Sequence, residues 1–341
     1  MAYGSCLLGA INLSEFVQNG EFKFDHFTEC VQDAVVALNE VLDEGIDLHP
    51  LEKQKEVATQ YRQIGLGLFG LADALIKMEL TYGEKNSLDM CDSIGHTFKN
   101  AAVQASANLA EKQGVFPQFN YEIISKSPFF QGLSEETKEI VKQKGLRNSQ
   151  LLTIAPNGST STMLGVSGGV EPTFAFSFIR STHNEDEADT FQFKVFSKVA
   201  KDYMDKHGLT SENDLPKWFI KSQDVPYRNR VDMQSVWQNH IDASISSTVN
   251  LPEEASIEDV ADLYTYAWEK GLKGITVYRD NCERAAVLLT KPKEGPKVTK
   301  LVEETPLTGL FAKCPGCQAE GTMFQSNGCA TCSSCGFSPC S

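Results

Sequence analysis

The residues with the clearest potential for chemistry are cysteines near the end of the chain. Six of the ten cysteines lie between Cys314 and Cys340, as a C-x2-C pair, a single cysteine, a second C-x2-C pair followed by Gly336, and a last cysteine. Four thiolates with this spacing suit tetrahedral Zn2+, which binds sulfur at about 2.3 Å. Gly336 favours the pair before it, because a tight metal knuckle benefits from a residue with free backbone angles. The spacing predicts a zinc ribbon with these ligands: Cys314, Cys317, Cys332 and Cys335.

The same cysteines allow a second zinc register, because Cys329 and Cys332 also form a C-x2-C pair. In the first register Cys329 and Cys340 are left over, and in the second Cys335 and Cys340 are left over. A spare pair of thiols is either a set of exposed bystanders or a dithiol that reduces a disulfide elsewhere by exchange. The spacing leaves both the register and the role of the spare pair open.

A polar turn near the middle of the chain is a second candidate site. It follows the apolar run 151–155, which is typical of a strand. The turn offers consecutive backbone N–H groups and hydroxyls, a composition suited to holding a phosphate. An ordinary capped turn is the competing interpretation, since the segment lacks the lysine of a P-loop. The candidate residues are Ala155, Pro156, Asn157, Gly158, Ser159, Thr160 and Ser161.

The four cysteines outside the tail carry less signal. Small hydrophobic residues in or near the core are the default interpretation for Cys6, Cys30, Cys91 and Cys282. The six histidines show no spacing typical of metal ligands. The residues alone therefore leave these cysteines without a chemical role.

Hydrophobic periodicity indicates the elements that must position these residues. Three- and four-residue spacing predicts helices over 27–42, 88–112 and 257–270, and the glycine-containing apolar segment 64–76 predicts the start of a buried helix. Short apolar runs over 173–179, 244–250 and 274–278 predict strands. Strands that alternate with helices indicate an α/β body with helix crossovers.

Composition limits the class of protein. The 31 basic and 45 acidic residues give a formal charge of −14, which disfavours general nucleic-acid binding. No segment approaches the roughly 18 uninterrupted apolar residues needed to cross a membrane. The first residues, 1–6, lack the basic and apolar regions of a secretory signal, so we expect a cytoplasmic protein. Residues 291–306 are rich in Lys, Pro, Glu, Gly and Thr, which predicts a flexible tether.

Taken together, these segments resemble the C-terminal half of the large chain of adenosylcobalamin-dependent ribonucleotide reductases. The resemblance runs through residues 3–13 (YGSCLLGAINL), 62–73, 151–180, 244–252 and 274–280 and through the Cys-rich tail. It implies half of a ten-stranded α/β barrel that surrounds a finger loop with a thiyl-radical cysteine. In this family the cobalamin generates the radical, the radical abstracts the ribose 3′-hydrogen, and a cysteine pair then reduces the 2′-carbon.

The resemblance also implies roles for individual residues. Cys6 is similar to one of the two active-site cysteines that become a disulfide at each turnover. The turn 155–161 is similar to the loop that holds the substrate phosphates, although Asn157 stands where a threonine is common. The spare tail pair, Cys329 and Cys340 or else Cys335 and Cys340, resembles the dithiol that reduces this disulfide with electrons from thioredoxin or glutaredoxin.

The sequence also departs from the family pattern. The family's Asn-x-Cys-x-Glu motif, which carries the radical cysteine, precedes the position of Cys6 and is absent here. An adjacent Tyr-Tyr pair, expected of the di-iron class, is absent because Tyr264, Tyr266 and Tyr278 are all separated, and the tail lacks the Arg-x-Cys-Gly-Tyr segment of the glycyl-radical class. The cobalamin class therefore fits best.

We expect the C-terminal fragment of a split reductase that reduces ribonucleotides together with a separate N-terminal fragment and can form a homodimer once assembled. The expected parts are half of the catalytic barrel over 1–290, a linker over 291–311 and a zinc-ribbon and redox tail over 312–341. The alternative is a non-catalytic zinc-ribbon interaction module or a decayed reductase fragment.

Overall fold

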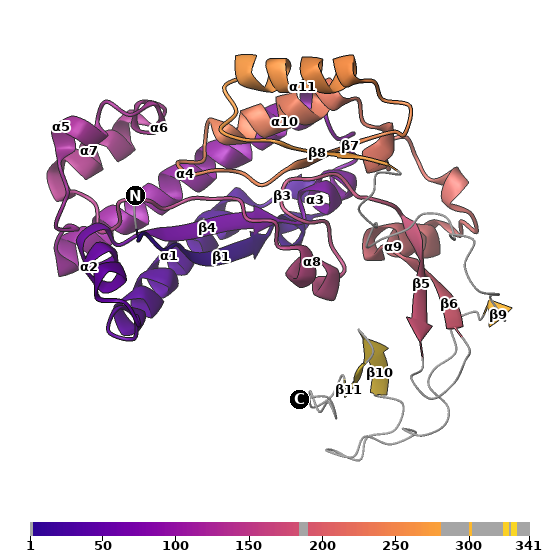
Figure 1. Ribbon diagram of the computed structural model, residues 1–341, viewed down its shortest axis with the longest axis horizontal. Helices are drawn as coiled ribbons and strands as arrows, with labels where there is room; N and C mark the ends of the chain where they lie inside the picture. The colour runs from indigo at the N-terminus through magenta and orange to yellow at the C-terminus, as the bar shows by residue number, and fades with distance from the viewer. Residues whose placement is uncertain (1–2, 184–189, 281–299, 302–322, 327–328, 333–341) are drawn as a thin grey trace. The chain divides into compact units, whose positions relative to one another are not determined.

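The computed structural model describes residues 3–183, 190–280, 300–301, 323–326 and 329–332 (Figure 1). The chain divides into two units. The larger comprises Met1–Phe174 and Ser197–Ala285, and the smaller comprises Ala175–Phe196 and Ala286–Ser341. The expected boundaries at 290 and 311 stay predictions.

The larger unit is built on a parallel array of strands. Strand β1 (Leu7–Asn12) pairs in parallel with β4 (Ile64–Phe69), and β7 (Thr248–Leu251) pairs in parallel with β8 (Thr276–Arg279). Single parallel bridges join Leu66 to Leu152 and Ile154 to Ile245, so the less regular segments 150–154 and 243–251 connect the two pairs. Helices separate the successive segments of this parallel array along the chain, which confirms the α/β class.

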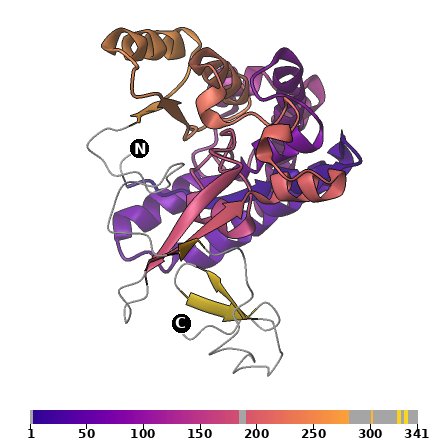
Figure 2. The ribbon, with the colours of Figure 1, turned by 90° about the vertical axis from the view of Figure 1, so that its right-hand side faces the viewer.

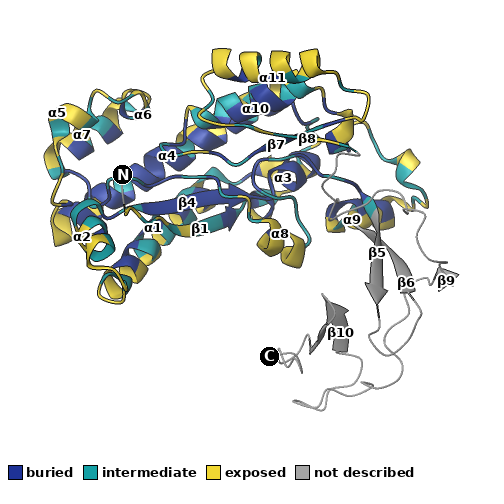
Figure 3. Cartoon of the chain, in the orientation of Figure 1, coloured by how far each residue is buried: buried dark blue, intermediate teal, exposed yellow. Residues whose placement is uncertain are grey.

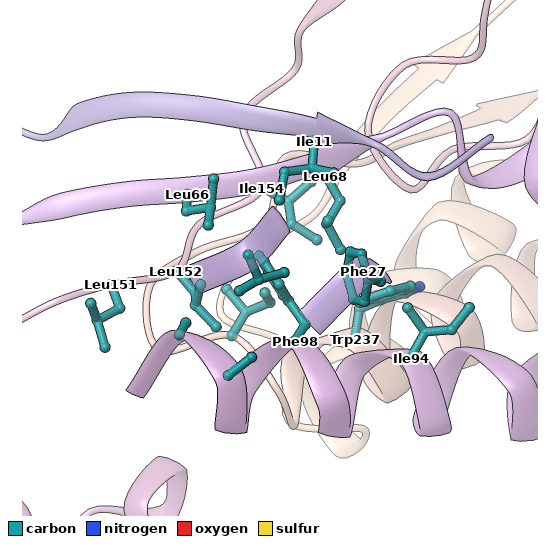
Figure 4. Packing of buried hydrophobic residues seen from close by; sticks show 14 of the residues in the cluster. Ile11, Phe27, Leu66, Leu68, Ile94, Phe98, Leu151, Leu152, Ile154 and Trp237 are labelled. Carbon is teal, nitrogen blue, oxygen red and sulfur yellow. The ribbon is translucent and has the colours of Figure 1, made fainter. Parts of the chain in front are cut away.

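Two long helices cover one face of this array. Helix α1 (Phe24–Ile46) and helix α4 (Lys85–Gln113) pack against each other, and α1 also packs against β1 and β4. Phe27, Phe98 and Trp237 are fully buried beneath Leu66 and Leu68 of β4 (Figure 4). The apolar spacing that predicts these two helices is therefore the spacing of side chains that reach the core.

The remaining helices surround this core, and helices α10 (Tyr227–Gln238) and α11 (Ile257–Glu269) pack together beside β7 and β8 (Figure 1 and Figure 2). Helix α11 confirms the helix predicted over 257–270. The other elements of the larger unit are the 3-10 helices η1 (Leu13–Phe16), η2 (Glu212–Asp214) and η3 (Ser222–Asp224), the short strands β2 (Val17–Gln18) and β3 (Glu21–Phe22), and the helices α2 (Glu52–Tyr61), α3 (Leu71–Lys77), α5 (Tyr121–Ile124), α6 (Pro128–Gln131), α7 (Glu135–Lys144), α8 (Gly158–Leu164), α9 (Lys198–His207), α10 (Tyr227–Gln238) and α11 (Ile257–Glu269).

The smaller unit contains two short β structures. Strand β5 (Ser177–His183) pairs with the antiparallel β6 (Thr190–Phe196), and β6 pairs in parallel with β9 (Lys300–Leu301). Strands β10 (Met323–Ser326) and β11 (Cys329–Cys332) form an antiparallel hairpin. The expected strand over 173–179 is thus only partly right, because β5 begins at Ser177.

The prediction of a buried helix from residue 64 is wrong in its first half. Residues 64–69 form β4, every residue of which is buried (Figure 3), and helix α3 begins only after Gly70, which has a φ of 72°. A Cβ atom on Gly67 would lie 2.4 Å from the Thr153 carbonyl oxygen. The glycines therefore allow neighbouring segments to approach a strand rather than helices to pack closely.

None of the helices within the described residues is long and apolar enough to cross a membrane. The predicted tether over 291–306 lies outside the described residues except for Lys300 and Leu301 in β9.

Candidate functional site

Cys6 lies immediately before β1, on the face of the array that α1 and α4 do not cover. A Cβ atom on Gly65 would lie 2.5 Å from Cys6 Sγ, 2.7 Å from Thr153 Cγ2 and 2.8 Å from Leu8 Cδ2. These three side chains therefore gather over a position where β4 has no side chain, whereas its neighbour Leu66 points into the core (Figure 4). The Cys6 side chain is exposed, so the default interpretation of a buried cysteine is wrong for it.

The other two described cysteines behave as small hydrophobic residues. Cys91 of α4 is fully buried, and Cys30 of α1 is half-buried against the same core. Burial raises the pKa of both thiols. Both residues confirm the default interpretation, and Cys282 lies outside the described residues.

Two glutamine side chains connect to the Cys6 sulfur. Gln150 Nε2 donates to Cys6 Sγ at 3.8 Å, and Gln63 Nε2 donates to Gln150 Oε1 at 3.2 Å. Both glutamines directly precede a segment of the parallel array, as Cys6 does. Three residues that are far apart in the sequence thus lie at the same end of the sheet, because the segments that follow them are parallel neighbours.

A carboxylate also influences this thiol. Asp242 accepts hydrogen bonds from the backbone N–H groups of Leu151 at 2.8 Å and Leu152 at 2.7 Å. Burial raises the pKa of Asp242 to about 6, although these hydrogen bonds favour the ionised form. Partial desolvation of the sulfur by the protein atoms around it and the negative charge of Asp242 together raise the pKa of Cys6. At neutral pH Cys6 is therefore mainly a protonated thiol.

The predicted phosphate turn becomes the beginning of a helix. Helix α8 starts at Gly158, directly after Asn157, which has a φ of 51°. The first N–H groups of a helix have no partner within it, so they are directed at whatever lies beyond the helix end. The Nδ2 atom of Asn157 is buried and has no hydrogen-bond partner in the described chain.

The hydroxyl groups of this turn divide into two sets. Ser161 Oγ and Thr162 Oγ1 donate to the carbonyl oxygen of Gly158 at 3.1 Å and 2.8 Å, so they serve the helix itself. Ser159 and Thr160 are exposed. A bound phosphate would therefore meet the backbone and these two hydroxyls rather than the whole row.

A pocket connects the turn to β1. It has a volume of about 290 Å3 and is lined by Leu8, Gly9, Ala10, Phe69, Asn157, Thr160 and Leu164. Leu8 lines this pocket and also lies beside Cys6 at Gly65. One continuous face thus runs from the thiol along β1 to the first turn of α8.

Most of the predicted tail site lies outside the described residues: Cys314, Cys317, Cys335 and Cys340. Cys329 and Cys332 begin and end β11, opposite Ser326 and Met323 of β10. In the part of the chain that the structure describes, His, Cys, Asp and Glu side chains form no group that could hold a metal ion. The zinc ligands and the spare dithiol stay predictions.

Sequence reasoning missed Gln63, Gln150 and Asp242. No local pattern marks any of them, because each acts on Cys6 or its supporting strand only through the pairing of distant segments. Gln150 does lie next to a segment that the pattern identified, the run 151–155. That adjacency was the one available signal.

Comparison with known proteins gives a consistent result. Residues 2–278 match the family model described as ribonucleotide reductase, barrel domain. A vitamin B12-dependent ribonucleoside-diphosphate reductase from Thermoplasma acidophilum is 32% identical over 92% of this chain and 40% of its own length. A protein of the same name from Mycobacterium tuberculosis is 30% identical over 84% of this chain and 41% of its own length. A ribonucleoside-diphosphate reductase subunit alpha from Chlamydia pneumoniae is 23% identical over 92% of this chain and 34% of its own length.

The chain spans about two fifths of the length of the first two relatives. The family match covers most of the larger unit, including Cys6, the 155–161 turn and the pocket between them. It ends before the Cys-rich tail. With its parallel array and its matched segment of 277 residues, from 2 to 278, the chain belongs to the ribonucleotide reductase barrel-domain family.

Proposed function

We propose that this chain contributes a reducible cysteine and a phosphate-binding turn to an enzyme that reduces ribonucleotides to deoxyribonucleotides. The observation that carries the proposal is the continuous face from the exposed Cys6 thiol to the pocket beside Asn157 and Thr160. Relatives that bear the name ribonucleoside-diphosphate reductase support a nucleotide substrate, and a di- or triphosphate would suit the turn.

In this proposal Cys6 supplies half of the reducing equivalents. Two thiols, Cys6 and a second cysteine from another part of the enzyme, give up two electrons and two protons and become a disulfide. The ribose 2′-hydroxyl leaves as water, and a hydrogen takes its place on the 2′-carbon. The protonated state of Cys6 suits this step, because the thiol delivers a proton as well as an electron.

The remaining parts of the proposal extend beyond the described site. An N-terminal reductase segment, supplied as a separate chain, provides the radical cysteine, and the assembled enzyme can form a homodimer. Two spare tail thiols, Cys329 and Cys340 or Cys335 and Cys340, reduce the disulfide with electrons from thioredoxin or glutaredoxin. Zn2+ binds the other four tail cysteines. In the first register these are Cys314, Cys317, Cys332 and Cys335.

Adenosylcobalamin is the proposed radical source, and it would supply a carbon-centred radical that oxidises the radical cysteine. The names of two relatives support it. The pocket of about 290 Å3 beside β1 is too small to enclose a corrin, so this pocket is not a site for the cobalamin. The proposed steps of this chain therefore rest on its own thiols and turn.

The test is reconstitution with matched cysteine variants. This chain is mixed with an N-terminal reductase segment that carries Asn-x-Cys-x-Glu, adenosylcobalamin, a ribonucleoside diphosphate and a thioredoxin system, and deoxyribonucleotide is measured by mass spectrometry. Cys6→Ser should abolish multiple turnover, whereas Cys30→Ser, at a half-buried site on α1, should retain it. Absence of product with every variant, or equal activity of both variants, would refute the proposal and favour a non-catalytic module.

A further inference from the structure

The side-chain amides of Gln63 and Gln150 lie beside Cys6 but take no part in the proposed reduction of the ribonucleotide. We propose that Gln150, held in orientation by Gln63, is a positioning residue that orients the Cys6 sulfur and stabilises its thiolate. The role in turnover rests on the proposed function of Cys6. The effect on the thiol itself does not.

The hydrogen-bond chain has a defined direction. A glutamine amide has one accepting oxygen and one donating nitrogen. Gln63 Nε2 donates to Gln150 Oε1 at 3.2 Å, so the Gln150 nitrogen is the end that faces Cys6 Sγ at 3.8 Å. In this arrangement the two ends of the Gln150 amide have different partners, the oxygen accepting from Gln63 and the nitrogen donating to the sulfur.

The backbone keeps the three residues together. The N–H group of Ile64, the residue after Gln63, donates to the Gln150 carbonyl oxygen at 3.1 Å. Leu7, the residue after Cys6, lies opposite Ile64 in the register of β1 and β4. Gln63 and Gln150 have intermediate exposure and the contact between Gln150 and Cys6 is open to solvent, so backbone pairing rather than burial holds the amide beside the sulfur.

The charge near the thiol makes such a donor useful. The carboxylate of Asp242 disfavours the Cys6 thiolate. Lys273 Nζ donates to the carbonyl oxygens of Asp242 at 2.6 Å and Ala243 at 3.1 Å, and its charge helps to keep the Asp242 carboxyl ionised. A neutral amide can stabilise a thiolate here without neutralising Asp242. The Asp242 carboxylate therefore keeps accepting hydrogen bonds from the N–H groups of Leu151 and Leu152.

The thiolate form matters when the disulfide is reduced. Disulfide exchange proceeds through thiolates, and a sulfur with a lower pKa leaves faster. A donor aimed at Cys6 Sγ therefore favours Cys6 as the leaving sulfur when a dithiol attacks its partner. The thiol stays protonated for ribonucleotide reduction because partial desolvation and the charge of Asp242 still raise its pKa.

The experiment measures the pH profile of Cys6 alkylation in the isolated chain. Iodoacetamide is added between about pH 6 and pH 10, which brackets the ordinary thiol pKa, and modification of the Cys6 peptide is quantified by mass spectrometry. Gln150→Leu should slow alkylation about three- to tenfold near pH 8 and move the midpoint upward, because a hydrogen bond to an ionised group is lost. Gln63→Leu should produce a smaller change in the same direction.

Two further variants separate electrostatics from packing. Gln150→Glu keeps the size of the side chain but replaces the donor with a carboxylate, so it should slow alkylation at least as much as Gln150→Leu. Gln118→Leu breaks a similar glutamine pair, in which Gln118 Nε2 donates to Gln60 Oε1 at 2.9 Å, and should leave the profile unchanged. If Gln150→Leu fails to fold by circular dichroism, Gln150→Glu and Gln63→Leu decide the result.

Superimposable profiles for wild type, Gln150→Glu and Gln63→Leu would overturn the inference. In the reconstituted enzyme, Gln150→Leu should lower kcat with thioredoxin and leave KM for the nucleotide unchanged. A shifted alkylation profile in an enzyme that makes no deoxyribonucleotide would refute the proposed function but support the inference. Normal turnover with a shifted profile would overturn the role assigned to Gln150 in disulfide exchange.

Discussion

Replacing each of two glycines of β4, Gly65 and Gly67, by alanine should destabilise the chain to different extents, because different atoms lie next to them. In Gly67→Ala the new Cβ atom would lie 2.4 Å from the Thr153 carbonyl oxygen, about 1 Å inside ordinary contact. In Gly65→Ala the new Cβ atom would instead meet side-chain atoms, Cys6 Sγ at 2.5 Å, Thr153 Cγ2 at 2.7 Å and Leu8 Cδ2 at 2.8 Å. A side-chain end can move where a backbone carbonyl cannot.

The size of the effect at Gly67 follows from the hydrogen bonds that a shift of about 1 Å would disturb. Leu66 N–H donates to the Leu151 carbonyl oxygen at 2.8 Å, and Thr153 N–H donates to the Leu66 carbonyl oxygen at 3.0 Å. Loss of two such bonds costs about 2 kcal/mol, and overpacking adds about 1 kcal/mol. The smaller backbone entropy of unfolded alanine offsets about 0.5 kcal/mol. We predict that Gly67→Ala lowers the free energy of unfolding by about 2.5 kcal/mol.

Gly65→Ala should cost only about 1 kcal/mol, because the atoms that it meets belong to side chains, two of which, Cys6 and Leu8, can rotate away. It should, however, displace the Cys6 sulfur from Gln150 and change the alkylation rate of Cys6, which Gly67→Ala should affect less. Urea unfolding followed by circular dichroism measures the stability, and peptide mass spectrometry measures the alkylation rate. A Gly67→Ala chain as stable as wild type, or less destabilised than Gly65→Ala, would refute the packing argument for β4.

Three further predictions concern stability and turnover. Because the folded-state pKa of Asp242 is raised to about 6, this carboxyl contributes stability at low pH that is lost as the pH rises from about 4 to 6. The free energy of unfolding of Asp242→Asn, measured by urea titration, should therefore rise by about 2 kcal/mol relative to that of wild type between pH 4 and pH 7. A difference that stays constant with pH would contradict this. Phe98→Ala removes a fully buried ring from the core and should lower the free energy of unfolding by about 3 to 5 kcal/mol in the same assay, whereas a loss below about 1 kcal/mol would place Phe98 outside the core. In the reconstituted enzyme Cys340→Ser should abolish turnover with thioredoxin but keep most turnover with a small dithiol, because a small reductant reaches the active site directly; equal losses with both reductants would remove the shuttle role.

Part of this protein is predictable from local pattern. Helices α1, α4 and α11 follow from apolar residues at three- and four-residue intervals, because each helix buries one side and exposes the other. The family follows from short motifs such as the one around Cys6, and the family match over 2–278 confirms it. A polar turn does follow the run 151–155, and its residues begin helix α8; its role in phosphate binding stays a prediction.

Other features have no local pattern. Strand β4 is buried on both faces, so it lacks the alternation that marks a half-exposed strand, and its glycines suggested a helix. The segment 150–154 is held mainly by single bridges and by Asp242, so its sequence reveals a strand but not its neighbours.

The sequence by itself determined helices α1, α4 and α11, the family and the chemical types available, because periodicity and motif lie within short stretches of chain. The tertiary structure decided that the Cys6 thiol is exposed, that Leu8 connects it to a pocket beside Thr160, and that Gln63 and Gln150 direct an amide at its sulfur. The physical reason is register. Parallel pairing brings together residues 6, 63 and 150, and a shift of one residue in any segment would turn the side chains to the opposite face.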